Sequence, residues 1–223
     1  MNSVLKKSQQ VAFEQKEAIT YVIEPTEIED KPVYLAIKRF SDIVISIVAC
    51  AVLLIPMGLI TAAIKLDSKG PVIYKQERLG KGGKPFTIYK FRSMRIDAEE
   101  NGPQWADKID LRCTRVGRFL RKIRLDELPQ LWNILKGDMS LVGPRPERPY
   151  FYDQFETYIH GFRNRLIVQP GLTGLAQVNG GYDLKPEEKI VYDMEYIRIR
   201  SLWVDLQCIF KTIRLIVTHE GAR

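Results

Sequence analysis

The sequence predicts an α+β fold that is mostly helical, with one long apolar segment and a small domain that contains a β-hairpin. Three observations carry this prediction: an uncharged apolar run over residues 43–64, a β-type pattern over residues 71–94, and several helical patterns beyond residue 110. The 223 residues suffice for one core with appendages. The content of 45% apolar and 27% charged residues is typical of a folded chain.

The first 32 residues are polar and mixed in charge. They lack the apolar stretch near the N-terminus that a secretory signal requires. We expect residues 1–32 to form a tail or a loosely docked helix.

The apolar run over residues 43–64 contains no charged side chain and is long enough to cross a bilayer. Basic residues flank it on both sides, which favours placing both of its ends on the cytoplasmic side. Pro56 lies inside the run, removes an internal hydrogen bond and bends a helix. These residues leave open a re-entrant helix and a kinked span, and they disfavour a buried core helix because no polar face exists. The flanking basic residues are Lys38, Arg39, Lys65 and Lys69.

Residues 71–94 predict a β-hairpin, because two segments rich in β-branched and aromatic residues flank the turn sequence G-K-G-G-K at 80–84. Residues 114–122 predict a helix with Thr114 as its N-cap.

A second helix is predicted to open near Asp126 and to end at Gly137, with Pro129 in its first turn. This placement would put Asp126 and Glu127 at the positive end of the helix dipole. A rigid G-P-R-P loop at 143–146 follows.

Residues 147–165 and 187–200 are predicted to be helical, and residues 170–174 form a turn-rich loop between them. The segment 202–217 is amphipathic, so it either lies in a membrane interface or packs on the core. Its apolar stripe comprises Trp203, Leu206, Phe210, Ile213 and Val217.

The net charge of +7 favours anionic partners, which are nucleic acids, phosphorylated substrates or anionic lipids. The three cysteines are widely spaced and neither histidine lies at zinc-ligand spacing from them, so we expect reduced thiols and no zinc site.

The acidic pair Asp126-Glu127 follows directly on a stretch, residues 111–125, that contains six basic and no acidic side chains. A carboxylate can attack phosphorus, provided that a metal and basic side chains offset the negative charge of the phosphate. Glu127 is the candidate ligand for Mg²⁺. The plainer alternative is that the acids cap a helix and that the arginines form a solvated face. The candidate phosphate-binding residues are Lys90, Arg92, Arg121, Arg124 and Arg145.

Several motifs occur in an order that resembles a known family, the bacterial sugar transferases. These are monotopic polyprenyl-phosphate phosphoglycosyltransferases, and the resemblance covers about Tyr34 to Thr218. The motifs are K-R-F-S-D (38–42), K-L-D-S-K-G-P-V (65–72), Y-K-F-R-S-M (89–94), R-L-D-E-L-P-Q-L-W-N (124–133), G-D-M-S-L-V-G-P-R-P (137–146), P-G-L-T-G-L-A-Q-V (170–178) and Y-D-M-E-Y-I (192–197).

The resemblance implies transfer of a sugar-1-phosphate from a UDP-sugar to undecaprenyl phosphate with release of UMP. It implies a ping-pong route in which Asp126 becomes covalently bonded to the phospho-sugar, with Mg²⁺ on Glu127. It also implies a re-entrant helix over residues 33–66, bent at Pro56, that follows the tail and precedes a catalytic domain over residues 67–223. The expected location is the cytoplasmic face of the bacterial inner membrane, in contact with membrane lipid and not with nucleic acid, and a homodimer is left open.

Some positions depart from the common family pattern, including Ile55 before the proline, Gln169 and Leu175. The sequence N-G-G-Y-D-L at 179–184 resembles the exopolysaccharide and capsule subgroup, which favours a hexose such as glucose or galactose. The main alternative function is that of a basic, non-catalytic membrane adaptor.

Overall fold

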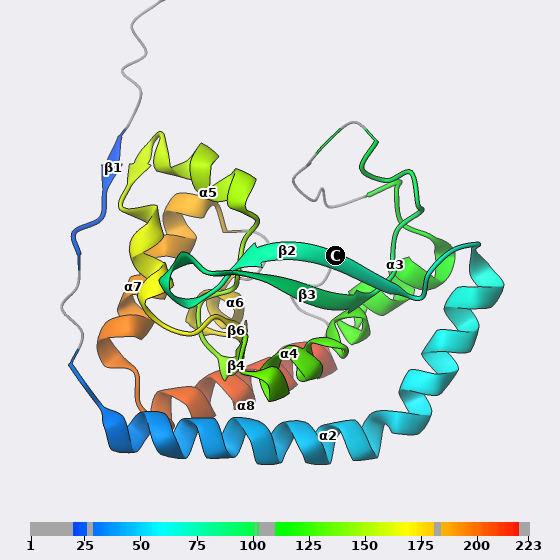
Figure 1. Cartoon of the computed structure of the whole chain (residues 1–223), viewed down its shortest axis with the longest axis horizontal. Helices are drawn as coiled ribbons and strands as arrows, with labels where there is room; N and C mark the ends of the chain where they lie inside the picture. Colours follow the sequence, from blue (N-terminus) through cyan, green and yellow to red (C-terminus); the bar gives the residue numbers. More distant parts are fainter. Residues whose placement is uncertain (1–19, 26–28, 101, 103–109, 181–183, 219–223) are drawn as a thin grey trace, which may run out of the picture.

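The computed structural model describes residues 20–25, 29–100, 102, 110–180 and 184–218. The described chain is mostly helical, with three two-stranded sheets, so the predicted α+β class is confirmed at this level. One long helix runs along one side of the molecule, and the hairpin and the shorter helices form a body that lies against it (Figure 1).

The long helix α2 extends over Pro32–Asp67 and is longer at both ends than the apolar run. It contains Pro56, and its ribbon bends so that a first limb is followed by a second limb that turns back toward the body (Figure 1). A proline explains such a bend, because it has no N–H to donate to the preceding turn. An 18-residue window of α2 has a mean hydropathy of 2.9 and is only 11% buried, so by length and composition this helix could cross a membrane.

The first limb of α2 is attached to the body by polar side chains. The ammonium of Lys38 lies 2.8 Å from a carboxylate oxygen of Asp205 in α8 (Leu202–Thr218). Arg39 donates to the carbonyls of Ile134 and Leu135 at 2.6 and 2.8 Å, which satisfies the C-terminal end of α4 (Gln130–Lys136).

The second limb packs on the body through an apolar cluster and two polar contacts. Ile60 and Ile64 are buried together with residues of β3 (Pro85–Phe91) and α3 (Arg115–Lys122). Asp67 accepts a hydrogen bond from the N–H of Val116 at 3.1 Å, and Arg92 donates to the carbonyls of Ser68 and Lys69. Both ends of α2 are therefore fixed to the same body.

The predicted hairpin is confirmed: β2 (Ile73–Leu79) pairs antiparallel with β3, and the turn between them contains the short 3-10 helix η1 (Lys81–Gly83). The predicted helix at 114–122 is confirmed as α3, whose N-cap Thr114 accepts from the N–H of Gly117 at 3.0 Å. A β-carbon on Gly117 would lie 1.9 Å from the carbonyl oxygen of Ser93, so this close packing of α3 on the end of the hairpin requires glycine.

The prediction that a helix begins near Asp126 is wrong about the first residue of the helix. Arg124 adopts a left-handed conformation (φ 58°) and is followed by a separate 3-10 turn, η2 (Leu125–Glu127), while α4 begins only at Gln130. The left-handed residue ends the path of α3 and turns the acidic pair inward. Gly137 ends α4 with φ 90°, as expected.

The predicted helix at 147–165 is divided into α5 (Pro149–Glu156) and the 3-10 helix η3 (Phe162–Ile167). Strand β5 (Ile159–His160) separates them and pairs in parallel with β1 (Tyr21–Val22). This part of the N-terminal segment is thus docked as a strand instead of a helix, and residues 1–19 lie outside the described residues. Buried aromatic side chains explain the strongly apolar sequence of this region, and they are Phe151, Tyr152, Phe155 and Phe162.

The G-P-R-P and P-G-L-T-G loops lie against each other. Strand β4 (Ser140–Val142) pairs in parallel with β6 (Gly171–Thr173), a contact that the sequence analysis missed. A β-carbon on Gly171 would lie 2.1 Å from the backbone nitrogen of Gly143, which explains why the two loops approach only through glycine.

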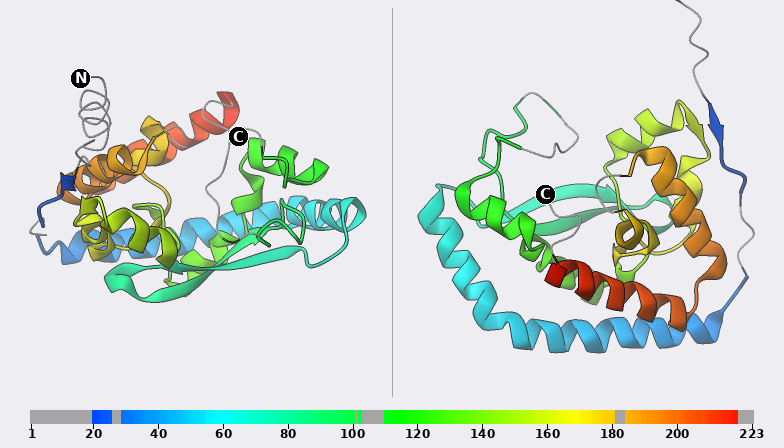
Figure 2. Two further views of the ribbon diagram at one scale, coloured as in Figure 1. Left: turned by 90° about the horizontal axis from the view of Figure 1, so that it is seen from above. Right: turned by 180° about the vertical axis from the view of Figure 1, so that it is seen from behind.

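The remaining helices are α6 (Leu175–Asn179), α7 (Pro186–Ile199) and α8, and the last two match the predicted segments. Helix α8 begins beside the N-terminal part of α2 and diverges from it (Figure 2). Its packed face contains Asp205 and Cys208. The predicted apolar stripe is the opposite face, and Trp203 and Phe210 are each 67% exposed.

Candidate active site

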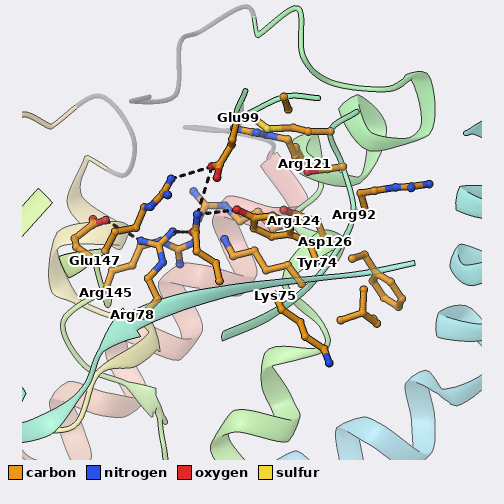
Figure 3. A pocket seen from close by; sticks show the side chains of 18 of the residues that line it. Tyr74, Lys75, Arg78, Arg92, Glu99, Arg121, Arg124, Asp126, Arg145 and Glu147 are labelled. Atoms are coloured by element: carbon orange, nitrogen blue, oxygen red, sulfur yellow. Dashed lines mark hydrogen bonds and ion pairs between the residues drawn. The ribbon is translucent and has the colours of Figure 1, made fainter. Parts of the chain in front are cut away.

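A cavity of about 640 Å³ lies between the hairpin, η2 and the G-P-R-P loop (Figure 3). This volume lies within the usual range for small-molecule sites. Basic side chains dominate its polar lining, with the carboxylate of Asp126 among them. The predicted site residues that line it are Lys90, Arg92, Arg121, Arg124, Asp126 and Arg145.

Asp126 is 8% exposed and lines the cavity from η2. Burial raises the pKa of its carboxyl above the usual aspartate value, and the neighbouring charge of Glu127 raises it further. The charges of Lys90, Arg121 and Arg145 act in the opposite direction. The carboxyl group of Asp126 is therefore held at the wall of a cationic cavity, where burial outweighs the neighbouring cations and favours its protonated form.

Glu127 is 6% exposed and lies behind Asp126, in contact with two cations. Lys90 donates to one carboxylate oxygen at 3.1 Å, and the guanidinium of Arg145 forms a two-point ion pair with both oxygens. Burial alone would raise the pKa of Glu127, but the charges of Arg145 and Lys90 and the hydrogen bonds from Arg145 hold it well below its usual range. Glu127 is thus ionised and serves to place both cations beside Asp126.

The two cations reach Glu127 from separate elements that other residues fix in position. Lys90 lies on β3, which Asn133 joins to α4. The side chain of Asn133 accepts a hydrogen bond from the N–H of Tyr89 at 3.1 Å and donates one to the carbonyl of Thr87 at 2.7 Å. Arg145 lies in the G-P-R-P loop. Its backbone carbonyl accepts a hydrogen bond from the guanidinium of Arg165 at 2.8 Å. The loop is held further by Arg78, which donates to the carbonyl of Pro146 and pairs with Glu147.

Arg121 and Arg124 come from the end of α3 and the residue before η2, and both line the same cavity as Asp126. The structure therefore brings five of the predicted residues together around this cavity: Lys90, Arg121, Arg124, Asp126 and Arg145. Figure 3 shows the last four of them.

The structure places the other predicted residues differently. The guanidinium of Arg92 points away from Asp126 toward the end of α2, where it donates to Ser68 and Lys69 (Figure 3). Lys38 and Arg39 bind the body, as described above, and do not extend freely from the helix. Arg92 is thus a residue that joins α2 to the wall of the cavity.

Sequence reasoning missed the far wall of the cavity, which is formed by η3, α6 and α7. Arg165 and Asp193 form an ion pair of 2.6 Å there, and both side chains are almost fully buried. The Y-D-M-E-Y-I motif was the only signal for Asp193, and Arg165 had none. The missed lining residues on this wall are Arg165, Gln177, Lys189 and Asp193, and Glu147 beside the G-P-R-P loop was also missed.

The described residues contain no group of three or more His, Cys, Asp or Glu side chains that could hold a metal ion. This donor set does not fit a protein-only metal cage. Mg²⁺ that is bound together with substrate phosphates and water needs only one or two protein carboxylates. Asp126 offers one at the cavity, whereas both oxygens of Glu127, which is not among the lining residues, accept from Lys90 and Arg145.

Comparison with known proteins assigns a family. Residues 33–219 match the family described as bacterial sugar transferase. A protein of Aeromonas hydrophila named UDP-N-acetylgalactosamine-undecaprenyl-phosphate N-acetylgalactosaminephosphotransferase is 50% identical over 196 residues, which cover 86% of this chain and 46% of the relative. Two proteins named UDP-glucose:undecaprenyl-phosphate glucose-1-phosphate transferase are also similar. The one from Klebsiella pneumoniae is 45% identical over 185 residues, 80% of this chain and 40% of the relative. The one from Caulobacter vibrioides is 44% identical over 193 residues, 83% of this chain and 71% of the relative.

The chain therefore spans less than half the length of the Aeromonas and Klebsiella relatives. The matched part of this chain includes α2, the cavity and α8.

Proposed function

The chain belongs to the bacterial sugar transferase family, and we propose that it transfers a sugar-1-phosphate from a UDP-sugar to undecaprenyl phosphate. The observation that carries this proposal is the buried carboxylate of Asp126 at the wall of a cavity rich in lysine and arginine. A non-catalytic adaptor would not need such a cavity or a buried carboxyl group at its wall.

In the first step, an oxygen of Asp126 attacks the β-phosphorus of the UDP-sugar. The bond between that phosphorus and the oxygen bridging the two phosphates breaks, and UMP leaves with the bridging oxygen. In the second step, an oxygen of the lipid phosphate attacks the same phosphorus and displaces Asp126, which yields undecaprenyl-diphospho-sugar. Each step exchanges one phosphorus–oxygen bond for another, so no oxidant or reductant is required.

The basic residues serve these steps by stabilising negative charge. Two anions, the carboxylate and the diphosphate, must approach each other, and cations at fixed positions lower the energy of that approach. Arg145 is well suited to this, because a guanidinium binds phosphate oxygens in two-point geometry. Its ion pair with Glu127 holds it in place before the substrate arrives.

Glu127, with Asp126 beside it, would hold Mg²⁺ together with the diphosphate oxygens once one of its carboxylate oxygens exchanges Lys90 or Arg145 for the ion. When bound, this ion would neutralise charge on the diphosphate and on the leaving UMP. A test independent of turnover is binding of Mn²⁺ as a spectroscopic substitute. We expect UDP to strengthen Mn²⁺ binding in the wild type and to have little effect in Glu127→Gln.

We further propose that α2 enters and leaves the membrane on the cytoplasmic face. The support is that both of its ends are fixed to one body, by Lys38 and Arg39 at the start and by Asp67 and Arg92 at the end. A spanning helix would have its ends about 30 Å apart on opposite faces. Single cysteines introduced beside Lys38 and beside Lys69 would mark the two ends of α2. Impermeant thiol reagents applied to intact cells should label neither of them, and labelling beside Lys69 alone would mean that α2 spans the membrane.

The sugar is a hexose or an N-acetylhexosamine, since the relatives are named for glucose and for N-acetylgalactosamine. A panel of UDP-glucose, UDP-galactose and UDP-N-acetylgalactosamine would identify it. Purified protein in detergent with Mg²⁺ and undecaprenyl phosphate should release UMP with one of these donors. Absence of UMP release with every donor, from protein of native secondary structure, would refute the function.

A further inference from the structure

A second hollow lies outside the catalytic cavity, between the second limb of α2 and α3. It measures about 450 Å³, and its walls are apolar side chains apart from Arg115. Leu59 and Ala63 of α2 form one wall, and Val116 and Phe119 of α3 form the other. Since Leu59 is 68% exposed and Phe119 is 60% exposed, this groove is open to the surroundings.

The groove and the catalytic cavity are separate hollows that both border α3. One face of this eight-residue helix lines the groove, and Arg121 in its last turn lines the cavity that contains Asp126. Arg121 lies six positions after Arg115, which corresponds to a rise of roughly 9 Å along a helix. One elongated molecule could therefore occupy the groove and reach the catalytic carboxylate.

The chemistry of α3 selects an amphiphile with an anionic head. The helix carries Arg115, Arg118 and Arg121, while Val116, Phe119 and Leu120 give it an apolar side against α2. A water-soluble nucleotide sugar has no apolar part to fill such a groove, whereas a hydrocarbon chain makes favourable apolar contacts with its walls.

We propose that this groove binds the isoprenyl chain of the acceptor, next to its phosphate, while the phosphate reaches Arg121 and Asp126. This inference rests on the proposed function and adds to it the site for the acceptor chain. The bent second limb of α2 thus forms one wall of a substrate site in addition to anchoring the chain.

Filling the groove tests the proposal. Ala63 lines it and Ala62, its neighbour on α2, is exposed and does not line it, so Ala63→Phe and Ala62→Phe add the same bulk inside and outside the groove. We expect Ala63→Phe to lower kcat/KM for undecaprenyl phosphate about tenfold, the loss expected when roughly two methylene groups lose apolar contact. Ala62→Phe should behave as the wild type.

Comparison of the two half-reactions separates a blocked groove from a damaged site. UMP release measured without acceptor should fall less in Ala63→Phe than transfer to undecaprenyl phosphate does. The loss of kcat/KM in Ala63→Phe relative to the wild type should also be smaller with a two-isoprene phosphate as acceptor, because its chain fills less of the groove. Equal losses in both half-reactions, or equal behaviour of the two variants, would overturn the proposal.

A direct measurement does not depend on turnover. An undecaprenyl phosphate carrying a photoreactive group on its second isoprene unit should crosslink to peptides containing residues 59–63 or 116–120. Unlabelled undecaprenyl phosphate should compete, whereas phosphatidylglycerol at the same concentration should not. Labelling elsewhere, or equal competition by phosphatidylglycerol, would identify the groove as a general lipid contact and refute a dedicated acceptor site.

Discussion

Two buried acidic centres border the same cavity, and they differ in their balance of charge. In η2, Asp126 and Glu127 face Lys90, Arg121 and Arg145, so cations outnumber acids. On the far wall, the single carboxylate of Asp193 pairs with the single guanidinium of Arg165, and both are almost inaccessible to solvent.

The pKa shifts differ between the two centres. Glu127 lies between two cations, which overcome the effect of burial and lower its pKa, whereas burial prevails at Asp126 and raises its pKa. Burial also prevails at Asp193 over the charges of Arg165 and Lys189 and raises its pKa to about 6. The far pair compensates itself and stabilises the fold, whereas the turn keeps surplus positive charge for an anion that comes from outside. Comparison of the two centres indicates that a surplus of cations over acids, more than burial, distinguishes an anion-binding site from a structural ion pair.

The largest expected effect is on activity at the turn. Asp126→Asn removes the nucleophile and should lower UMP release by roughly 10⁴- to 10⁶-fold, the range of losses seen when members of a nucleophilic catalytic set are removed. Stability should not fall, because burial and Glu127 disfavour the ionised carboxylate in the folded state.

The matched control is Asp97→Asn, since Asp97 is exposed and its ion pair with Arg95 lies at the surface. Mass spectrometry after incubation with donor alone should find the phospho-sugar adduct on Asp126 in the wild type and the control. Turnover of Asp126→Asn at the wild-type rate, or an adduct on another residue, would refute the role of Asp126.

The next effect is on stability, at the far wall. Arg165→Met leaves Asp193 buried without its cation and should lower the free energy of unfolding by about 3–5 kcal/mol. Chemical denaturation in detergent measures this loss. The double variant Arg165→Met/Asp193→Leu should recover most of it, because no unpaired charge remains.

Arg163→Met is the control on the same element, because Arg163 is exposed and pairs with Asp153 at the surface. Arg163→Met should lower the free energy of unfolding by no more than about 1 kcal/mol. If both arginine variants lost the same stability, Arg165 would have no special structural role.

A smaller effect is expected at Asn133, which positions the turn without taking part in the chemistry. Asn133→Ala leaves the buried N–H of Tyr89 and the carbonyl of Thr87 without this partner, and should cost about 2 kcal/mol of stability. Asn133→Asp retains the acceptor for Tyr89 but sets a buried carboxylate against the carbonyl of Thr87 and the carboxylate of Asp138, so its loss in chemical denaturation should be at least as large. Equal stability of all three proteins would show that the hairpin does not depend on this link.

The parts of the fold that the sequence predicted are those with strong local signals. The hairpin, the Thr114 cap, α7 and α8 depend on residues close in sequence, and the structure confirms them. The pairings of β4 with β6 and of β1 with β5 involve two or three residues each, too few for an alternating pattern. The break between η2 and α4 depends on the left-handed Arg124, which sequence periodicity does not report.

The candidate site was predictable to the extent that its residues lie in motifs. The cluster of Lys90, Arg121, Arg145 and Asp126 combines segments that the sequence marked as basic or acidic. The sequence analysis assigned Arg92 to phosphate, because an arginine that caps a helix terminus has the same sequence signature as one that binds an anion. Arg165 was missed because its role arises only from the docking of η3 on α7.

The smallest expected effect is a shift in pH dependence. UMP release requires ionised Asp126, whose pKa is raised by burial and by Glu127 and lowered by Lys90. The acid limb of the wild-type rate should therefore lie above the usual titration range of aspartate, and Lys90→Gln should move it to still higher pH. The exposed Lys81 in the hairpin turn provides the control Lys81→Gln, which should leave the limb in place. A lower rate of Lys90→Gln with an unmoved limb would mean that Lys90 only positions groups. A limb that moved to lower pH would contradict the view that the charge of Lys90 favours the ionised form of Asp126.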